Sequence, residues 1–188
     1  MDEPTPSLSS LGVAVLALLA ERPMHPYEMY QLMLQRRDDR LVKVRPGSLY
    51  HSVDRLTATG LAEATGTDRD GNRPERTTYR VTERGRQALR QRLGLMLSRP
   101  AEEYPEFPLA LSQAHNLDRS DAAPLLEERL SAMRSTLSSL DEAGTDLVGR
   151  DVPERFWIDL DYQRAVLRAE LAWLERLLDR LTAGQLDW

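Results

Sequence analysis

The spacing of apolar residues predicts four helices in the first half of the chain, over about residues 8–21, 26–37, 46–60 and 82–98. In the third segment Leu49, Val53 and Leu56 fall at positions i, i+4 and i+7, so they share one face of a helix. The fourth segment repeats this pattern. Its residues expected to face inward are Ala88, Leu89, Leu93 and Leu97.

Two short segments with strand character, residues 61–67 and 76–81, separate the third and fourth predicted helices. Asp70-Gly71 lies between them and favours the positive-φ turn of a β-hairpin. Three helices, a hairpin and a further helix is the element order of a winged helix-turn-helix domain. In such a domain one helix enters the major groove of DNA, and the hairpin contacts the backbone or the minor groove.

The third predicted helix carries hydrogen-bonding side chains away from its apolar face. The helix alone is equally typical of an ordinary protein surface, but the hairpin that follows it favours DNA binding. The candidate DNA-binding residues are Tyr27, Lys43, Arg45, Ser48, Tyr50, His51 and Arg55, with Arg69, Asn72, Arg73 and Arg76 on the hairpin.

The second half of the chain is predicted to be all helical, over residues 107–115, 120–142 and 153–182, with a loop at 144–153. Three prolines within residues 99–108 predict a linker there. The expected fold is therefore mainly α with a small β-hairpin wing. It consists of a winged helix-turn-helix DNA-binding domain (1–98), the linker (99–108) and a C-terminal α-helical dimerisation domain (109–188).

The last predicted helix has the clearest periodicity in the chain. Its apolar residues follow three- and four-residue steps, as in a heptad repeat: Trp157, Leu160, Leu167, Leu171, Leu174, Leu178 and Leu181. Such a seam packs either within one chain or between two chains. Val166, Trp173 and Leu177 widen the apolar surface beyond what one partner helix covers, so we predict that the seam forms a homodimer.

Four aromatic residues of the second half are candidates for a small-molecule effector pocket between the halves of a dimer: Phe107, Trp157, Tyr162 and Trp173. Ordinary core and interface packing is the alternative interpretation, and helical spacing does not decide between the two.

The net charge of −5 is unevenly distributed along the chain. Residues 1–98 hold 15 Lys+Arg and 12 Asp+Glu, a balance of +3, whereas residues 99–188 hold 10 and 18, a balance of −8. We therefore expect the first half to meet DNA phosphates. The chain has no cysteine, no basic leader and no apolar run long enough to cross a bilayer, so we expect a cytoplasmic protein without disulfides or membrane insertion.

The sequence also bears on two other classes of function. The three histidines are dispersed, and the chain has no Gly-rich phosphate loop and no nucleophile motif, so we expect no enzyme, no cofactor and no metal site. A winged helix used only for protein–protein contact is the alternative function. It would show an apolar or acidic face on the third helix, and this face is neither.

Four places in the sequence resemble the PadR family of transcription regulators. They are Leu18-Leu19 with His25-Pro26-Tyr27-Glu28-Met29; Gly47-Ser48-Leu49-Tyr50 with Arg55-Leu56 and Gly60-Leu61; Gly71-Asn72-Arg73-Pro74 with Thr78-Tyr79-Arg80-Val81-Thr82; and Gly85-Arg86. The resemblance covers residues 8–95, and the second half resembles the C-terminal helical domain of the virulence-activator-like branch. It implies a dimeric DNA-binding regulator, usually a repressor of a pseudo-palindromic operator, that a small-molecule effector can release from DNA.

Two residues depart from the family pattern. His51 stands where a proline often follows Gly-Ser-Leu-Tyr, and His25 stands where a glycine is common before the tyrosine. Either change can alter contacts or packing, so no operator preference is carried over from the family.

Overall fold

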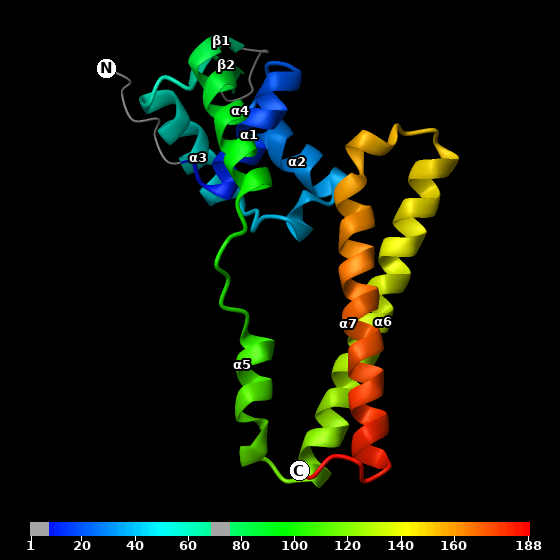
Figure 1. Ribbon diagram of the computed structural model, residues 1–188. Coiled ribbons are helices and arrows are strands. Elements are labelled where there is room, and N and C mark those ends of the chain that lie inside the picture. The colour runs from blue at the N-terminus through cyan, green and yellow to red at the C-terminus, as the bar shows by residue number, and fades with distance from the viewer. Residues whose placement is uncertain (1–7, 69–75) are drawn as a thin grey trace. The chain divides into compact units, whose positions relative to one another are not determined.

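The computed structural model describes residues 8–68 and 76–188 of the chain. The chain divides into two units, Met1–Glu102 and Glu103–Trp188, each with its own apolar core. Both units are mainly helical, and the sheet among the described residues is a two-stranded antiparallel hairpin in the first unit (Figure 1). The predicted fold class, mainly α with a small β-hairpin, is confirmed.

The described part of the first unit contains four α-helices, a 3-10 turn and the two strands of the hairpin. Their bounds are α1 (Ser10–Glu21), α2 (Pro26–Arg36), η1 (Asp38–Arg40), α3 (Pro46–Ala58), β1 (Ala62–Asp68), β2 (Arg76–Val81) and α4 (Glu83–Ser98). Three of these helices have an N-cap residue whose side chain accepts a backbone N–H group that the first helical turn leaves unpaired. These are Ser9 for α1, His25 for α2 and Thr82 for α4.

The core of the first unit lies between α1, α2, α3 and the base of the hairpin. Leu49, Val53 and Leu56 of α3 are all buried, so the apolar face predicted from their spacing is confirmed. Met29 and Met33 of α2 are also fully buried in this core. The core therefore fixes α3 by one face and leaves its opposite face to solvent.

The far half of α4 differs from the prediction. Ala88 and Leu89 join the core, but Leu93 and Leu97, which were expected to face inward, are 39% and 88% exposed. Periodicity identifies the apolar face of a helix but not how much of that face is covered. In α4 the covered part of the face ends at Leu89.

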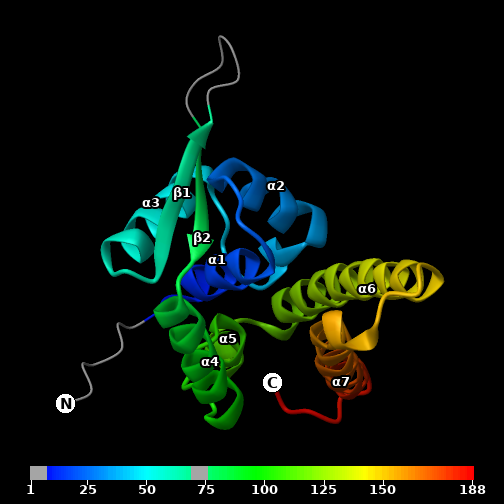
Figure 2. The same ribbon diagram turned by 90° about the horizontal axis from the view of Figure 1, so that it is seen from above.

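The hairpin is anchored at its base and extends away from the helices, as Figure 2 shows. β1 and β2 pair antiparallel, with one irregularity in β1 between Ala64 and Gly66. A further bridge joins Tyr79 of β2 to Met24, and each backbone N–H donates to the other's carbonyl at 3.1 Å. The segment that leads from α1 into α2 is therefore tied to the hairpin.

The second unit contains three α-helices and two 3-10 turns. Their bounds are α5 (Glu106–Gln113), η2 (Ala114–Asn116), α6 (Arg119–Gly149), η3 (Glu154–Phe156) and α7 (Ile158–Thr182). α6 and α7 run antiparallel, side by side (Figure 1). Ion pairs cross between them, with Arg134 to Glu175 at 2.7 Å and Arg164 to Asp141 at 2.6 Å.

Three boundaries in the second half depart from expectation. α5 begins at Glu106, inside the stretch that was predicted as a linker. α6 continues to Gly149 instead of ending near residue 142, and Gly144 lies buried within the helix against the side chain of Arg164. α7 begins at Ile158, and Trp157 precedes it with non-helical backbone angles. None of the described helices is both long and apolar enough to cross a membrane.

Candidate nucleic-acid interface

The solvent face of α3 carries the polar residues selected from the sequence. Because the apolar face is turned into the core, His51 lies outward, with Tyr50 on one flank and Ser48 and Arg55 on the other. All four residues are exposed. Ser48, His51 and Arg55 also line a small cavity of about 110 Å³ together with Ser9. These side chains therefore form one accessible polar surface.

The other flank of α3 meets the start of α2. The rings of His25 and Tyr50 lie edge to face, with centroids 6.2 Å apart. Nδ1 of His25 accepts the Tyr27 N–H at 3.0 Å, so this histidine caps α2 and contacts α3 at once. Tyr27 and Tyr50 remain 55% and 42% exposed, and His25 links the segments that carry them. The sequence marked His25 as a departure from the family but did not indicate this contact.

Lys43 and Arg45 precede α3, and both side chains are exposed. Many arginines of the first unit are engaged elsewhere: those at positions 22, 36, 80 and 90 each form an ion pair with a glutamate. Within residues 8–68 and 76–188, neither Lys43 nor Arg45 forms an ion pair. Their charges are therefore not neutralised by any described carboxylate.

Two of these ion pairs join the end of α1 to α2, one at each end of α2. Arg36, at its end, donates hydrogen bonds to Glu21 of α1, and this holds the pKa of the Glu21 carboxyl below its usual value. Arg22, which follows α1, donates a hydrogen bond to Glu28 in the first turn of α2, and this lowers the pKa of the Glu28 carboxyl as well. Both carboxylates stay ionised at neutral pH and clamp α1 to α2.

The hairpin residues can be placed only in part. Arg76 begins β2, whereas Arg69, Asn72 and Arg73 lie outside the described residues. Closer to the base, Nε of Arg80 donates to Glu63 across the hairpin at 2.7 Å. No group of three potential metal ligands occurs among the described residues.

Comparison with known families assigns the first unit. Residues 15–91 match the model of the transcriptional regulator PadR-like family. The chain contains a PadR-like domain. The match includes α2, α3 and the hairpin, and with them all the candidate DNA-binding residues. No curated protein matches the chain in sequence.

Solved structures similar to the chain extend beyond the PadR-like domain into the second unit. PadR of Bacillus subtilis in complex with operator DNA has a TM-score of 0.79 and 21% identity, covering 93% of this chain and 99% of that one. The same protein in complex with p-coumaric acid has a TM-score of 0.74 and 19% identity, covering 97% and 99%. The Vibrio cholerae virulence activator AphA has a TM-score of 0.68 and 17% identity, covering 93% and 99%. At these identities the similarity shows a shared fold.

Beyond the PadR-like domain, the structure corrects the assignment of the seam on α7. Leu171, Leu174, Leu178 and Leu181 pack against α6 of the same chain, and each is at most 9% exposed. Leu160 is also buried, Leu167 is half-buried against the same core, and Trp157 lies before the helix. The seam is therefore an interior contact of one chain, because α6 extends far enough to cover it. It does not present the surface for a second chain that the sequence analysis expected.

A different apolar face of α7 is accessible. Residues at four-, four-, three- and four-residue steps lie opposite the seam, and we call them the outward stripe of α7: Ile158, Tyr162, Val166, Ala169 and Trp173. The four large side chains are between 41% and 69% exposed. From the sequence, Val166 and Trp173 are expected only at the margin of the seam. The missed signal is a second apolar periodicity, offset around the same helix.

The four aromatic residues proposed for an effector pocket do not gather within one chain. Phe107 and Trp173 meet edge to face at 6.4 Å, and the Arg129 guanidinium lies 3.5 Å from the Phe107 ring centroid. Trp157 is sixteen residues earlier than Trp173, roughly 24 Å along a helix, and its Nε1 donates to the Val152 carbonyl. Tyr162 belongs to the outward stripe. Phe107 and Trp173 thus form one contact, and Trp157 and Tyr162 lie elsewhere.

Proposed function

We propose that the protein is a sequence-specific DNA-binding regulator of transcription. α3 enters the major groove, and the β1–β2 hairpin contacts the backbone or the minor groove. The observation that carries the proposal is the solvent face of α3, where Ser48, Tyr50 and His51 stand beside Lys43 and Arg45, whose charges no described carboxylate neutralises. A helix of this kind beside a hairpin has the geometry of a winged-helix DNA reader. The fold shared with an operator-bound PadR supports the same assignment.

The alternative is a winged helix that contacts only proteins. Such a domain would need an apolar or strongly acidic face on α3. Here Asp54 is the one acidic residue of the helix, and the apolar residues are turned into the core. The proposal of DNA binding is therefore favoured by the chemistry of the exposed surface.

The proposal includes a homodimer on a pseudo-palindromic operator. A two-fold axis places two copies of α3 about one helical turn of DNA apart. We assign the dimer contact to the outward stripe of α7, because it is the apolar face of that helix that α6 leaves exposed. Apolar residues repeated along a helix face suit a partner helix of the same kind.

We further propose that the protein represses transcription and that a small molecule releases it from DNA. A dimer that occupies an operator blocks access of other proteins to that DNA. Release by an effector is suggested by the similar Bacillus subtilis PadR, whose structure is solved with p-coumaric acid. Neither α3 nor the hairpin needs a cofactor for the contacts described.

The experiment that tests DNA binding is selection of bound sequences from random duplexes with the full-length protein, followed by titration at several salt concentrations. We expect one enriched pseudo-palindrome. Replacing Lys43 and Arg45 with alanine should weaken specific and non-specific DNA alike and reduce the salt slope by about one for each lost phosphate contact. Arg150→Ala removes one exposed positive charge from the second unit and serves as the control. Failure to enrich any sequence, with salt-independent binding, would contradict the proposal.

A further inference from the structure

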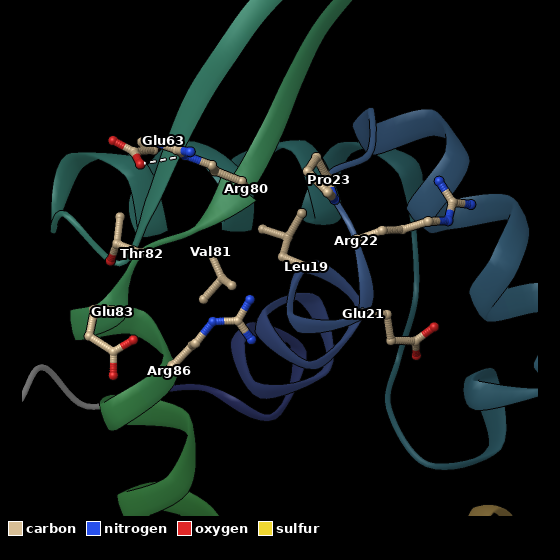
Figure 3. Close-up of a pocket in the computed structure, with 10 residues that line it drawn as sticks. All are labelled: Leu19, Glu21, Arg22, Pro23, Glu63, Arg80, Val81, Thr82, Glu83 and Arg86. Carbon is tan, nitrogen blue, oxygen red and sulfur yellow. Dashed lines mark hydrogen bonds and ion pairs between the residues drawn. The ribbon is translucent and has the colours of Figure 1, made fainter.

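The first unit contains a cavity of about 530 Å³ that the DNA-binding surface does not use. It lies between the end of α1, the base of β2 and the start of α4, and Figure 3 shows the residues around it. Its lining is mixed: Leu19, Val81 and Pro23, which is exposed at the rim, form a small apolar patch, and the other seven lining residues are polar or charged. A volume of this size is within the range of small-molecule sites in proteins, roughly 300–1,000 Å³.

The charged residues around the cavity are matched in pairs, with one exception. The three glutamates are each held by an arginine: Glu21 by Arg36, Glu63 by Arg80 and Glu83 by Arg90. Arg22, a further lining residue, is held by a glutamate of α2. Once these pairs are set aside, the charge that remains at the cavity is the single positive charge of Arg86.

Arg86 is half-buried and reaches from α4 toward the end of α1 (Figure 3). Among the described residues, its guanidinium donates one hydrogen bond, from Nη1 to the Ala20 carbonyl at 3.3 Å, and pairs with no carboxylate. A guanidinium has five N–H donors in a planar fork. Most of its donor capacity is thus available at the cavity, beside the apolar patch.

We propose that this cavity binds a small organic acid, whose carboxylate pairs with Arg86 and whose apolar part covers Leu19, Pro23 and Val81. A planar carboxylate matches the fork of a guanidinium and can accept two parallel hydrogen bonds from it. The half-buried position strengthens the ion pair, because solvent screens it less than a pair on the open surface. The apolar patch favours an acid with an apolar part over an inorganic anion, which would leave the patch uncovered.

The position of the cavity connects it to the proposed DNA-binding surface. Pro23 precedes Met24, which is bridged to β2 at Tyr79, and His25, which caps α2 and contacts Tyr50 of α3. A ligand that covers Pro23 and Val81 therefore acts on both the hairpin and the start of α2. This coupling rests on the proposed function, whereas binding of the acid to the cavity does not.

Binding is tested on the full chain by titration of its ¹³C-methyl NMR spectrum with pentanoate. The expected result is a saturable shift of the Leu19 and Val81 methyl signals in the millimolar range. Pentanamide, which is neutral and of similar shape, and inorganic phosphate, which is an anion without an apolar part, should each bind at least about tenfold more weakly. No saturable shift, or equal binding of either comparison compound, would overturn the proposal.

Substitutions locate the contact. Arg86→Gln should weaken pentanoate binding at least about tenfold, and Arg92→Gln, at a half-buried arginine of α4 outside the cavity, should leave it unchanged. If Arg86→Gln does not fold, Pro23→Glu at the exposed rim tests the same point by placing a negative charge beside the site. A folded variant of either kind that binds pentanoate as the parent does would refute the role of Arg86.

The coupling has its own readout. Saturating pentanoate should change the affinity of the parent for its selected DNA and leave that of Arg86→Gln unchanged. A chain that binds no DNA would refute the proposed function, while the NMR titration would still decide whether the cavity binds the acid. Pentanoate binding without any change in DNA affinity would refute the coupling.

Discussion

At the scale of single residues, the outward side chain of α3 is expected to influence which base pairs are preferred. His51 is exposed and lies at the centre of the polar surface of that helix. His51→Ala should therefore change the preferred base at one position of each half-site by roughly 1–3 kcal/mol. Competition binding of operator variants measures this, with Gln31→Ala on the exposed side of α2 as the control. If His51→Ala ranks every variant as the parent does, α3 does not read a base there.

A second residue-scale prediction concerns the contact between α4 and the segment that joins α3 to β1. A Cβ at Gly85 would lie 2.0 Å from the Leu61 carbonyl oxygen and 2.9 Å from Cγ2 of Val81. The Leu61 carbonyl also accepts the Thr82 N–H, so this backbone cannot move away without losing a hydrogen bond. Gly85→Ala should lower the free energy of unfolding of the first unit by about 3 kcal/mol or more. Urea unfolding followed by circular dichroism measures it.

The matched control is Gly94→Ala in the same helix, where a Cβ would meet nothing within 4 Å. Because alanine is the better helix former, this change should raise stability by up to about 1 kcal/mol. Equal effects at positions 85 and 94 would show that helix propensity, rather than the close approach to Leu61, explains the glycine.

Residues differ in how far the sequence could specify them. The cap at Thr82 was predictable, because capping depends on the residue type and on the helix that follows it at once. The contact of His25 with Tyr50 and the hydrogen bond of Arg86 to the Ala20 carbonyl were not, since each depends on residues distant in sequence that only folding brings together.

At the scale of elements, the ion pair between the end of α1 and the end of α2 predicts a pH dependence of stability. The pKa of Glu21 is lowered in the folded state by the hydrogen bond from Arg36, so the pair stabilises the fold above the unfolded value of 4.5. That contribution is lost as the pH falls through the lower, folded pKa. Because both side chains are more than 40% exposed, solvent screening limits the effect to about 1 kcal/mol or less.

Glu21→Gln should therefore reduce stability at pH 7, and the difference from the parent should vanish as the pH falls well below 4.5. Urea unfolding at a series of pH values measures this difference. Asp54→Asn, at an exposed carboxylate of α3, is the control for loss of a negative charge. A difference that stayed constant down to the lowest pH would mean that the ion pair is not its source.

Elements were predicted well where one face of a helix is covered along its whole length. α3 is such a case, and its buried face and its exposed polar surface both followed from spacing. The extent of the buried face of α4 and the end of α6 were not predicted correctly, because an apolar pattern does not indicate where the covering element ends. α4 leaves its core after Leu89, while α6 stays paired with α7 as far as Gly144. In α7 the stronger periodicity belongs to the intrachain contact, which left the weaker, outward stripe unrecognised.

At the scale of the whole molecule, we predict that the outward stripe of α7 forms the dimer and that operator binding depends on it. Replacing Tyr162 and Val166 with glutamate would place two unpaired charges in the middle of an apolar contact, which disfavours association strongly. The variant should sediment as a monomer. It should bind a half-operator as the parent does but lose the tighter binding of a full operator, because the second contact is no longer intramolecular.

The seam provides the contrasting variant. Leu174 is fully buried between α6 and α7, so Leu174→Ala should lower the stability of the second unit by about 2–5 kcal/mol and leave the dimer intact. Deleting residues 154–188 is a less informative test, because it would expose the face of α6 that α7 covers and promote aggregation. A Tyr162/Val166 variant that stayed dimeric with full operator affinity would move the interface to another surface. A Leu174→Ala protein that became monomeric while folded would return it to the seam.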